Sequence, residues 1–211
     1  CKVTMDCVDL KKDVIEYCTS VAEKLHYDRL HFLAGDIRDF PVRRKPDLTV
    51  SLHACDIATD IVLAKAVTSG SRVIMSTPCC HHELNHTINC KPLSFVTEHS
   101  MLRQKLCDAA TDALRLKKLE ANNYSCVAVE LIDPEETPKN ILLRAIKKAN
   151  TPANLKRADA AKGEYEIARK FGKDIVIMEP VKGGSLVKLP DEAKKVLNDL
   201  NGGTPASYAI R

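Results

Sequence analysis

Residues 78–92 carry the densest set of chemically capable side chains in this sequence. Cysteine, histidine, glutamate and asparagine occur there without the periodicity of a helix or a strand. We therefore expect a long loop, the kind of segment in which functional residues concentrate. The candidates for catalytic contacts in this loop are Cys79, Cys80, His82 and Glu83.

Three other interpretations of this loop stay open from the sequence. It could hold a metal ion, present a Cys–His nucleophile pair, or use its polar side chains for packing alone. A metal site would use Cys79, Cys80, His82, His86 and Cys90. Adjacent cysteines differ from the C-x-x-C spacing of structural zinc sites, so we assign no metal.

Two acidic residues follow apolar stretches that predict successive strands. Asp9 ends the strand expected at residues 3–9, and Asp36 follows the strand expected at residues 31–35. Open sheets of parallel strands bind ligands at the carboxyl ends of their strands. A carboxylate there can accept both hydroxyls of a ribose, and a second can accept an adenine amino group, with Ile37 against the ring. The pair therefore predicts a nucleoside site.

The elements that must position these side chains alternate between strands and amphipathic helices. The expected strands are residues 3–9, 31–35, 48–54, 72–77 and 125–132. The expected helices are residues 10–25, 56–67, 98–120, a helix begun by Thr137 and Pro138, and residues 151–170. This alternation predicts an α/β fold with a mostly parallel sheet and helices on both faces. The strand at residues 48–54 is apolar enough to be buried on both sides.

Charge and composition argue against functions that need a strongly basic or an aromatic surface. The 211 residues include 32 basic and 28 acidic side chains, for a net charge of +4, and 45% of the residues are hydrophobic. The basic clusters are residues 43–45, 117–118, 147–148 and 156–157. They are short and interrupted by acids, as solvated surfaces usually are. With 4 Phe, 5 Tyr and no Trp, a base-stacking surface is not indicated.

Cysteine usage predicts a reducing compartment. The nine cysteines form an odd set with irregular spacing, and several lie inside apolar runs. No apolar stretch approaches the length of a membrane span, and the first residues do not have the pattern of a signal peptide. We expect a cytoplasmic protein with no membrane partner.

Four short segments resemble the motifs of class I S-adenosylmethionine-dependent methyltransferases. They are Val8-Asp9-Leu10, Gly35-Asp36-Ile37, Leu52-His-Ala-Cys-Asp56 and Pro78-Cys-Cys-His-His-Glu-Leu84. The nearest match is the subfamily with L-H-A-C-D and P-C-C-x-H-E, and residues 137–145 are similar to a segment near the end of its domain. The resemblance implies a Rossmann-like methyltransferase domain over residues 1–150. Its methyl acceptor is unidentified, and a small RNA, a protein or a metabolite all fit.

The resemblance also implies a cofactor and its ligands. S-adenosylmethionine would be bound by Asp9, Leu10, Asp36, Ile37, His53, Ala54 and Asp56. His53 has a second explanation, as a hydrogen-bonding residue at the end of its strand. The family's first strand and glycine-rich turn would precede residue 3. We therefore expect the chain as printed to bind the cofactor weakly and to have low activity.

Residues 164–211 resemble a different family, the aldo/keto reductases. The Met178-Glu-Pro-Val-Lys-Gly-Gly184 pattern is similar to a loop that meets the NADPH phosphates in that family, which implies NADPH contacts at Lys182, Gly183 and Gly184. A (β/α)8 barrel needs about 250 residues, so this tail would be a fragment. It would be joined through residues 151–163 and docked on the first domain or on another chain. An NADPH-binding reductase fragment and a non-catalytic Rossmann-like interaction module are therefore the alternatives.

Overall fold

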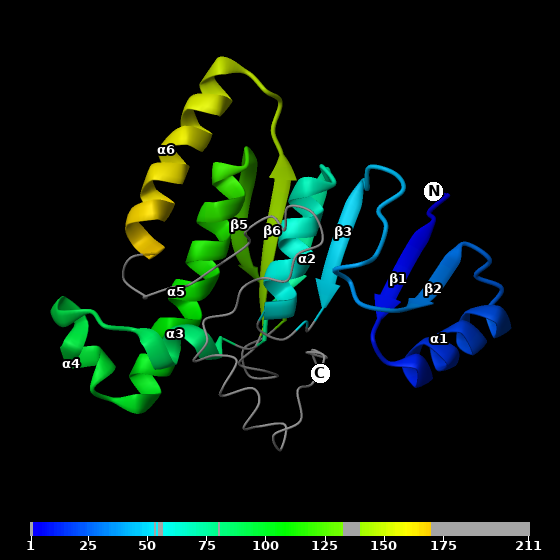
Figure 1. The fold of residues 1–211 in the computed structure, drawn as a ribbon, viewed down its shortest axis with the longest axis horizontal. Helices are drawn as coiled ribbons and strands as arrows, with labels where there is room; N and C mark the ends of the chain where they lie inside the picture. Colours follow the sequence, from blue (N-terminus) through cyan, green and yellow to red (C-terminus); the bar gives the residue numbers. More distant parts are fainter. Residues whose placement is uncertain (1, 53, 55–56, 80, 133–139, 170–211) are drawn as a thin grey trace. The chain divides into compact units, whose positions relative to one another are not determined.

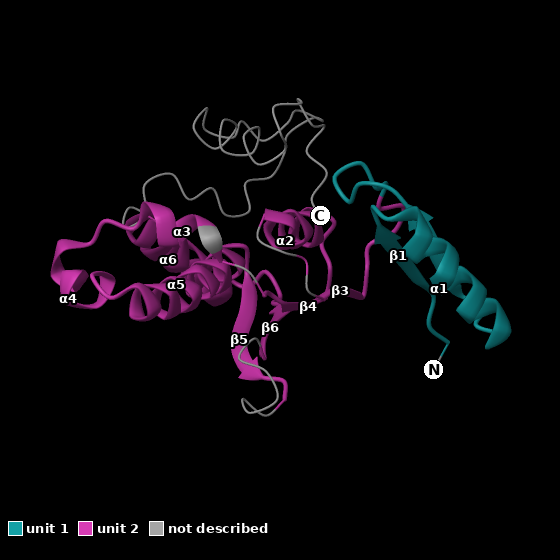
Figure 2. Ribbon diagram, turned by 90° about the horizontal axis from the view of Figure 1, so that it is seen from below, with its two compact units in different colours: residues 1–41, 181–211 teal, residues 42–180 magenta. Residues whose placement is uncertain are grey.

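The computed structural model describes residues 2–52, 54, 57–79, 81–132 and 140–169 of the chain. They form two compact units, unit 1 with residues 2–41 and unit 2 with residues 42–169 (Figure 2). The six cysteines in these ranges are free thiols. None of the helices in the described ranges is both long and apolar enough to cross a membrane.

Unit 1 is a β-α-β segment with parallel strands (Figure 1). β1 (Met5–Asp9) and β2 (Leu30–Ala34) pair in parallel, and Asp9 lies opposite Ala34. α1 (Lys12–Lys24) connects the strands, contacts both of them and buries Ala22. The sequence predicted these three elements to within a few residues.

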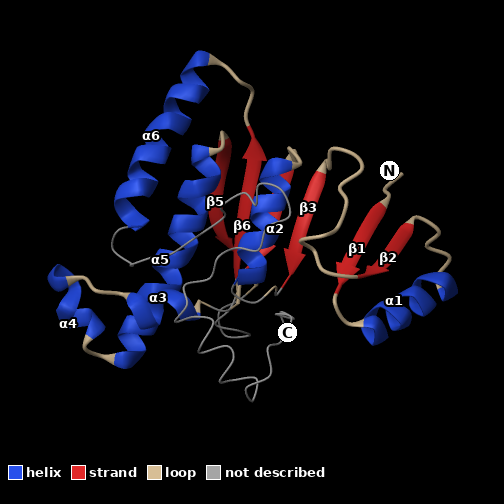
Figure 3. Ribbon diagram, viewed as in Figure 1, coloured by secondary structure: helices blue, strands red, loops and turns tan. Residues whose placement is uncertain are grey.

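Unit 2 contains a mixed sheet of four strands in the order β3-β4-β6-β5. The strands are β3 (Leu48–Leu52), β4 (Val73–Thr77), β5 (Tyr124–Glu130) and β6 (Ile141–Lys147). β3 and β4 are parallel, whereas β6 runs antiparallel to both β4 and β5 (Figure 3). The expected α/β class is confirmed. The first four strands pair in parallel as β1 with β2 and β3 with β4, but these two pairs belong to separate sheets, and two of the three pairings in the sheet of unit 2 are antiparallel.

Helices connect these strands. They are α2 (Ile57–Thr68), α3 (His82–Thr87), a short 3-10 helix (Lys91–Leu93), α4 (Ser94–Thr97), α5 (Ser100–Ala121) and α6 (Pro152–Ala168). α6 begins as its sequence indicated, because the Thr151 hydroxyl accepts a hydrogen bond from the Asn154 N–H at 3.3 Å and Pro152 occupies the first turn. α6 continues through residue 163, so the expected junction and the start of the expected tail lie in one helix.

Two sequence predictions of secondary structure are wrong. Residues 78–92, expected as a loop, contain α3 and the 3-10 helix. The reason is tertiary, since Leu84 of α3 is buried in the same cluster as Cys107 of α5. The helix expected from Thr137 onward is also wrong, because residues 141–147 form β6. The Thr-Pro signal is local, and pairing with β4 and β5 along β6 outweighs it.

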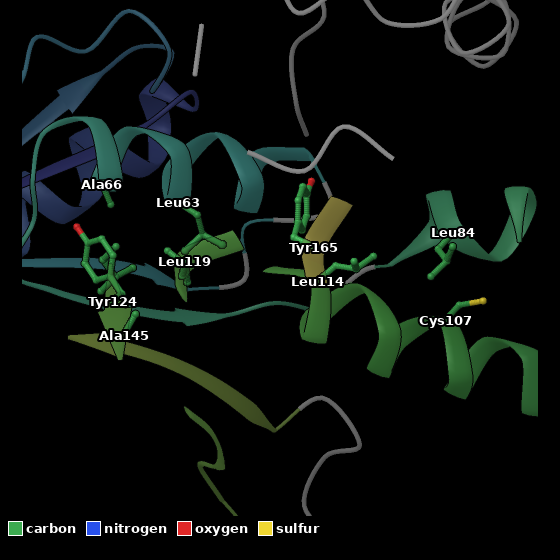
Figure 4. Close-up of a cluster of buried hydrophobic side chains, with 10 residues drawn as sticks. Leu63, Ala66, Leu84, Cys107, Leu114, Leu119, Tyr124, Ala145 and Tyr165 are labelled. Carbon is green, nitrogen blue, oxygen red and sulfur yellow. The ribbon is translucent and has the colours of Figure 1, made fainter. Parts of the chain in front are cut away.

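The helices α2, α5 and α6 pack on one face of this sheet (Figure 4). Leu63 of α2, Leu119 of α5 and Tyr165 of α6 are each at most 1% exposed and form one cluster with sheet residues Ile74 and Ala145. The cluster joins all three helices to the sheet, so these elements fold as one unit.

The opposite face of the sheet is open in the described residues. Val50, Val127 and Ile146 point to that face and are 42%, 37% and 42% exposed. The expectation that residues 48–54 are buried on both sides is therefore wrong for β3. Only the side that carries Ser51 is covered.

We predict that Leu63→Ala lowers the free energy of unfolding by about 2–5 kcal/mol, because it leaves a cavity in the cluster. Urea denaturation followed by circular dichroism measures the change. The matched control is Leu155→Ala, whose side chain is 45% exposed on α6, with an expected loss below about 1 kcal/mol. Equal losses in the two variants would contradict the cluster as the main source of stability.

We also predict that stability falls as the pH rises from about 9 to 12. Burial raises the pKa of Tyr124 to about 12, with a further contribution from Cys126. Burial, together with the charge of Glu120, raises the pKa of Cys126 to about 12. The unfolded chain releases both protons nearer their ordinary values of 10 and 9. The stabilisation is therefore complete below pH 9 and is lost toward pH 12.

The double variant Tyr124→Phe/Cys126→Ala tests this dependence. Between pH 8 and pH 11 the wild type should lose on the order of 2 kcal/mol more than the double variant. Urea titrations at the two pH values give the difference. Tyr17→Phe is the control, because that side chain is 72% exposed, and its fall should match the wild type. A double variant with the wild-type fall would show that these two groups do not control the transition.

Candidate functional site

The two motif segments of unit 2 leave the sheet at the same edge. Leu52 and Thr77 are the last residues of β3 and β4, and they lie opposite each other in the parallel register. The segments that begin at residues 53 and 78 therefore start side by side. The structure thus brings together two stretches that are about 25 residues apart in the sequence.

The expected site residues of these segments are only partly described. The Ala54 carbonyl accepts a hydrogen bond from the Thr59 hydroxyl, which joins the first segment to α2. Cys79 is half-buried, and Glu83 is exposed in the first turn of α3. His82 is the first residue of α3. His53, Asp56 and Cys80 lie outside the described residues, as do Lys182, Gly183 and Gly184.

The metal alternative gains no support from the described part of the chain. Among the described residues, no group of three or more His, Cys, Asp or Glu side chains is arranged to hold a metal ion. His86 is exposed on α3 and Cys90 is half-buried.

A buried charged cluster lies behind these segments and links them to α5. His81 is 4% exposed, and its Nε2 lies 2.9 Å from Asp112 Oδ1. The fully buried Arg115 donates from Nη1 to the same Asp112 oxygen at 3.1 Å. Arg115 also donates from Nε and Nη2 to the two carboxylate oxygens of Asp60 on α2, at 2.9 and 3.0 Å. We call these four residues, His81, Asp60, Asp112 and Arg115, the His81 cluster.

Ion pairs with Asp60 and Asp112 stabilise the charged form of Arg115 in this cluster. Burial by itself lowers the pKa of the Arg115 guanidinium, but hydrogen bonds and charge from Asp60 and Asp112 outweigh burial and raise the pKa above its ordinary value. Because an ionised carboxylate only accepts hydrogen bonds, His81 Nε2 carries the proton that is shared with Asp112. Nδ1 forms no hydrogen bond within the described residues and lies 3.5 Å from Asp108 Oδ1.

A chain of polar contacts extends the cluster to α3. Asp108 accepts a hydrogen bond from Gln104 Nε2 at 2.6 Å. Gln104 Oε1 accepts from Asn85 Nδ2 at 2.7 Å, and Asn85 Oδ1 accepts from Arg103 Nε at 3.2 Å. The helix that follows the second motif is therefore tied to α5 at several points. These contacts fix the backbone that presents residues 79–83.

Most of the His81 cluster is absent from the sequence prediction. His81 belongs to the expected loop, but Asp60, Asp112 and Arg115 do not stand out as functional residues in the sequence. One signal was available. Asp112 and Arg115 fall on the buried face of α5, and charged residues on such a face need partners.

Unit 1 carries the other expected site residues. Asp9 ends β1, and its carbonyl accepts a hydrogen bond from the Gly35 N–H at 2.9 Å, so the loops after β1 and β2 start together. Asp9 Oδ1 accepts from the Lys11 N–H at 2.8 Å, and the carboxylate is exposed. Leu10 is also exposed, at 38%.

The carboxylate of Asp36 accepts more hydrogen bonds than the carboxylate of Asp9. Oδ1 accepts from the Arg38 N–H at 2.8 Å, and Oδ2 accepts from both Nε and Nη2 of Arg38. These hydrogen bonds raise the pKa of Arg38. Ile37, between them, is half-buried. The sequence located Asp36 at the strand end but did not indicate its pairing with Arg38.

Comparison with known proteins matches part of this chain to a family. Residues 1–87 match the sequence profile of a family described as a methyltransferase domain. This range contains the segments around Asp9 and Asp36 and both motif segments of unit 2, although it is less than half of the chain. The match supports the expected class, a methyltransferase domain. A search of the curated proteins found no match.

Several solved structures are similar to this chain. The N-methyltransferase NodS from Bradyrhizobium japonicum WM9 is 12% identical, with a TM-score of 0.43 over 69% of this chain and 74% of that one. The PH0226 protein from Pyrococcus horikoshii OT3 is 13% identical, with a TM-score of 0.40 over 69% and 72%. The YcgJ protein from Bacillus subtilis is 10% identical, with a TM-score of 0.37 over 70% and 83%.

We predict that Asp60→Asn lowers the free energy of unfolding by about 3 kcal/mol, because it leaves the buried Arg115 without its bidentate partner. Glu120→Gln is the control. Glu120 pairs with Lys117 at a surface where both side chains are about one-third exposed, and the expected loss is below about 1 kcal/mol. Urea denaturation compares the two. A loss in Asp60→Asn no larger than in the control would contradict the role of this pair.

Proposed function

We propose that this chain carries an S-adenosylmethionine-dependent methyltransferase domain. The observation that carries the proposal is the methyltransferase-domain match over residues 1–87, because it covers all four segments singled out in the sequence. The pairing of Leu52 with Thr77 adds support, since it starts the two motif segments of unit 2 at one sheet edge. In this proposal Asp9 and Asp36 bind the nucleoside of the cofactor, and residues 79–83 are assigned to the acceptor.

The residues of unit 1 suit a nucleoside. Asp9 Oδ1 is engaged by the Lys11 N–H, while no described residue contacts Oδ2. An exposed carboxylate with open acceptor positions fits two ribose hydroxyls. Leu10 and Ile37 offer apolar contact beside the two carboxylates. Asp9 is therefore assigned to the ribose of the cofactor.

Asp36 fits a narrower role. Arg38 occupies Oδ2, and Oδ1 takes the Arg38 N–H. A carboxylate has about four acceptor positions, and we assign one of them to an adenine amino group. Arg38 then holds the carboxylate in place, and Ile37 covers the ring face.

The reaction needs alignment more than acid-base chemistry. S-adenosylmethionine supplies a sulfonium methyl group, whose bond to sulfur breaks as the acceptor atom forms its own bond to carbon and sulfur keeps the electron pair. A neutral acceptor also loses a proton. The side chains assigned to orienting the acceptor are Cys79, Cys80, His82 and Glu83. His81, their neighbour in the sequence, is held by Asp112, and positioning of the reacting groups can supply much of the rate.

The acceptor remains one of three classes. A metabolite, a protein side chain and a small RNA each have a nucleophilic atom that an alignment site of this kind accepts.

Calorimetric titration with S-adenosylhomocysteine tests the proposal. We expect Asp9→Ala to weaken binding by tenfold or more, because a charged hydrogen-bond acceptor is worth about 1.5–3 kcal/mol. Asp13→Ala is the matched control, since Asp13 lies four residues along, in the first turn of α1, and its affinity should be that of the wild type.

Absence of binding by the wild type, or equal affinity of Asp9→Ala and wild type, would overturn the proposal.

A further inference from the structure

A pocket of strongly basic character opens on unit 2. It has a volume of about 320 Å³ and is lined by Arg43, Arg44, Lys45 and Lys65, with Thr68 and Ser69 completing its wall. We call it the basic pocket. The first three cations are separated from β3 by Pro46 and Asp47, and the other residues belong to the end of α2 and the turn after it. None of the described residues that line it is acidic.

The strand order brings further cations to the same edge of the sheet. The Arg72 N–H donates to the Pro46 carbonyl at 3.1 Å, and the Lys147 N–H donates to the Arg72 carbonyl at 2.9 Å. Arg72 and Lys147 therefore lie at the same edge as the run 43–45, with Asp47 between them at the start of β3. This is the amino end of β3 and β4, opposite the edge from which the motif segments leave.

A glycine turn helps to fix the pocket. Gly70 has a φ of 71°, a left-handed conformation that favours glycine. The aliphatic stem of Lys45 packs against it, and a Cβ added to Gly70 would lie 3.5 Å from Lys45 Cε. The lysine stem is thus supported along its length, which leaves the ammonium to face outward.

Some basic residues in the described part of the chain form ion pairs. Arg38 pairs with Asp36, Lys117 with Glu120 and Arg169 with Glu166. Arg43, Arg44 and Lys45 make no ion pair with a described residue. The partial negative charge at the carboxyl end of α2 suits Lys65 but falls off within a turn, so it does not balance the run 43–45.

The positive potential reaches a neighbouring group. The pKa of Lys147 lies below its ordinary value, first because burial desolvates its ammonium and second because the charge of Lys45 is close. Lys147 already donates to the Asn122 carbonyl at 2.9 Å and lies over the Tyr124 ring. The charge of Lys147 therefore adds to the positive potential at this edge of the sheet. We do not assign Lys147 as a residue that contacts the bound anion.

We infer that the basic pocket binds the phosphates of a nucleic acid backbone. Guanidinium groups pair with phosphate oxygens bidentately. A single phosphate would neutralise only part of the charge, whereas a polymer can follow the cations along the edge. The described residues that line the pocket include no aromatic side chain, so we expect recognition of the backbone without base specificity. This inference rests on charge and geometry and does not require the proposed methyl transfer.

Fluorescence anisotropy with a labelled single-stranded RNA of mixed sequence tests it. The variant is Arg43→Glu/Arg44→Glu. The control is Lys156→Glu/Arg157→Glu on α6, which changes the net charge equally at a site with exposed cations. We expect the variant to weaken binding tenfold or more and to reduce the slope of log K against log salt by about 2. The control should stay within about threefold of the wild type.

Three outcomes would overturn the inference. They are no RNA binding by the wild type at about 50 mM salt, equal weakening by the variant and the control, and equally tight binding of inorganic polyphosphate of the same charge. The last result would assign the pocket to a simple anion. Circular dichroism of both variants verifies that they are folded, because all four substituted side chains are exposed.

Discussion

The buried guanidinium of Arg115 is the constraint on which unit 2 depends. A charge that is fully inaccessible to solvent is tolerated only when it is paired and hydrogen-bonded. Asp60 supplies this from α2 and Asp112 from α5, and Asp112 in turn contacts His81 in the segment after β4. Three pieces of chain distant in sequence must therefore meet in one arrangement. The candidate segment at residues 79–83 takes its position from that arrangement.

The sheet of unit 2 separates two kinds of chemistry. The parallel pairing of β3 and β4 sends both motif segments to one edge and gathers arginine and lysine residues at the other. Between these edges lies a single cluster of apolar side chains from α2, α5 and α6. A methyltransferase domain that also binds the phosphate backbone of RNA would use both edges of this sheet. The two assignments nevertheless stand on separate residues.

Local sequence patterns predicted some elements and missed others for a physical reason. The β-α-β segment of unit 1 and the start of α6 follow from periodicity and capping, which act over a few residues. Strand β6 did not follow, because its hydrogen bonds go to β4 and β5, and the nearby Thr-Pro signal favoured a helix. α3 was missed because its burial comes from Leu84 against α5, and its own residues are mostly polar. Asp9 and Asp36 were located as strand-end acids, but the engagement of Asp36 by Arg38 was not.

The sequence by itself determined the α/β class, the order of the first strands and helices, and the motif segments that point to a methyltransferase domain. These are properties of short stretches whose residue types act locally. Only the tertiary structure decided that Asp60, Asp112 and Arg115 support the second motif segment, and that residues 43–45 join Lys65 at one pocket. Contacts of this kind depend on which helix faces which strand. That is set by the burial of the whole cluster, which no window of neighbouring residues contains.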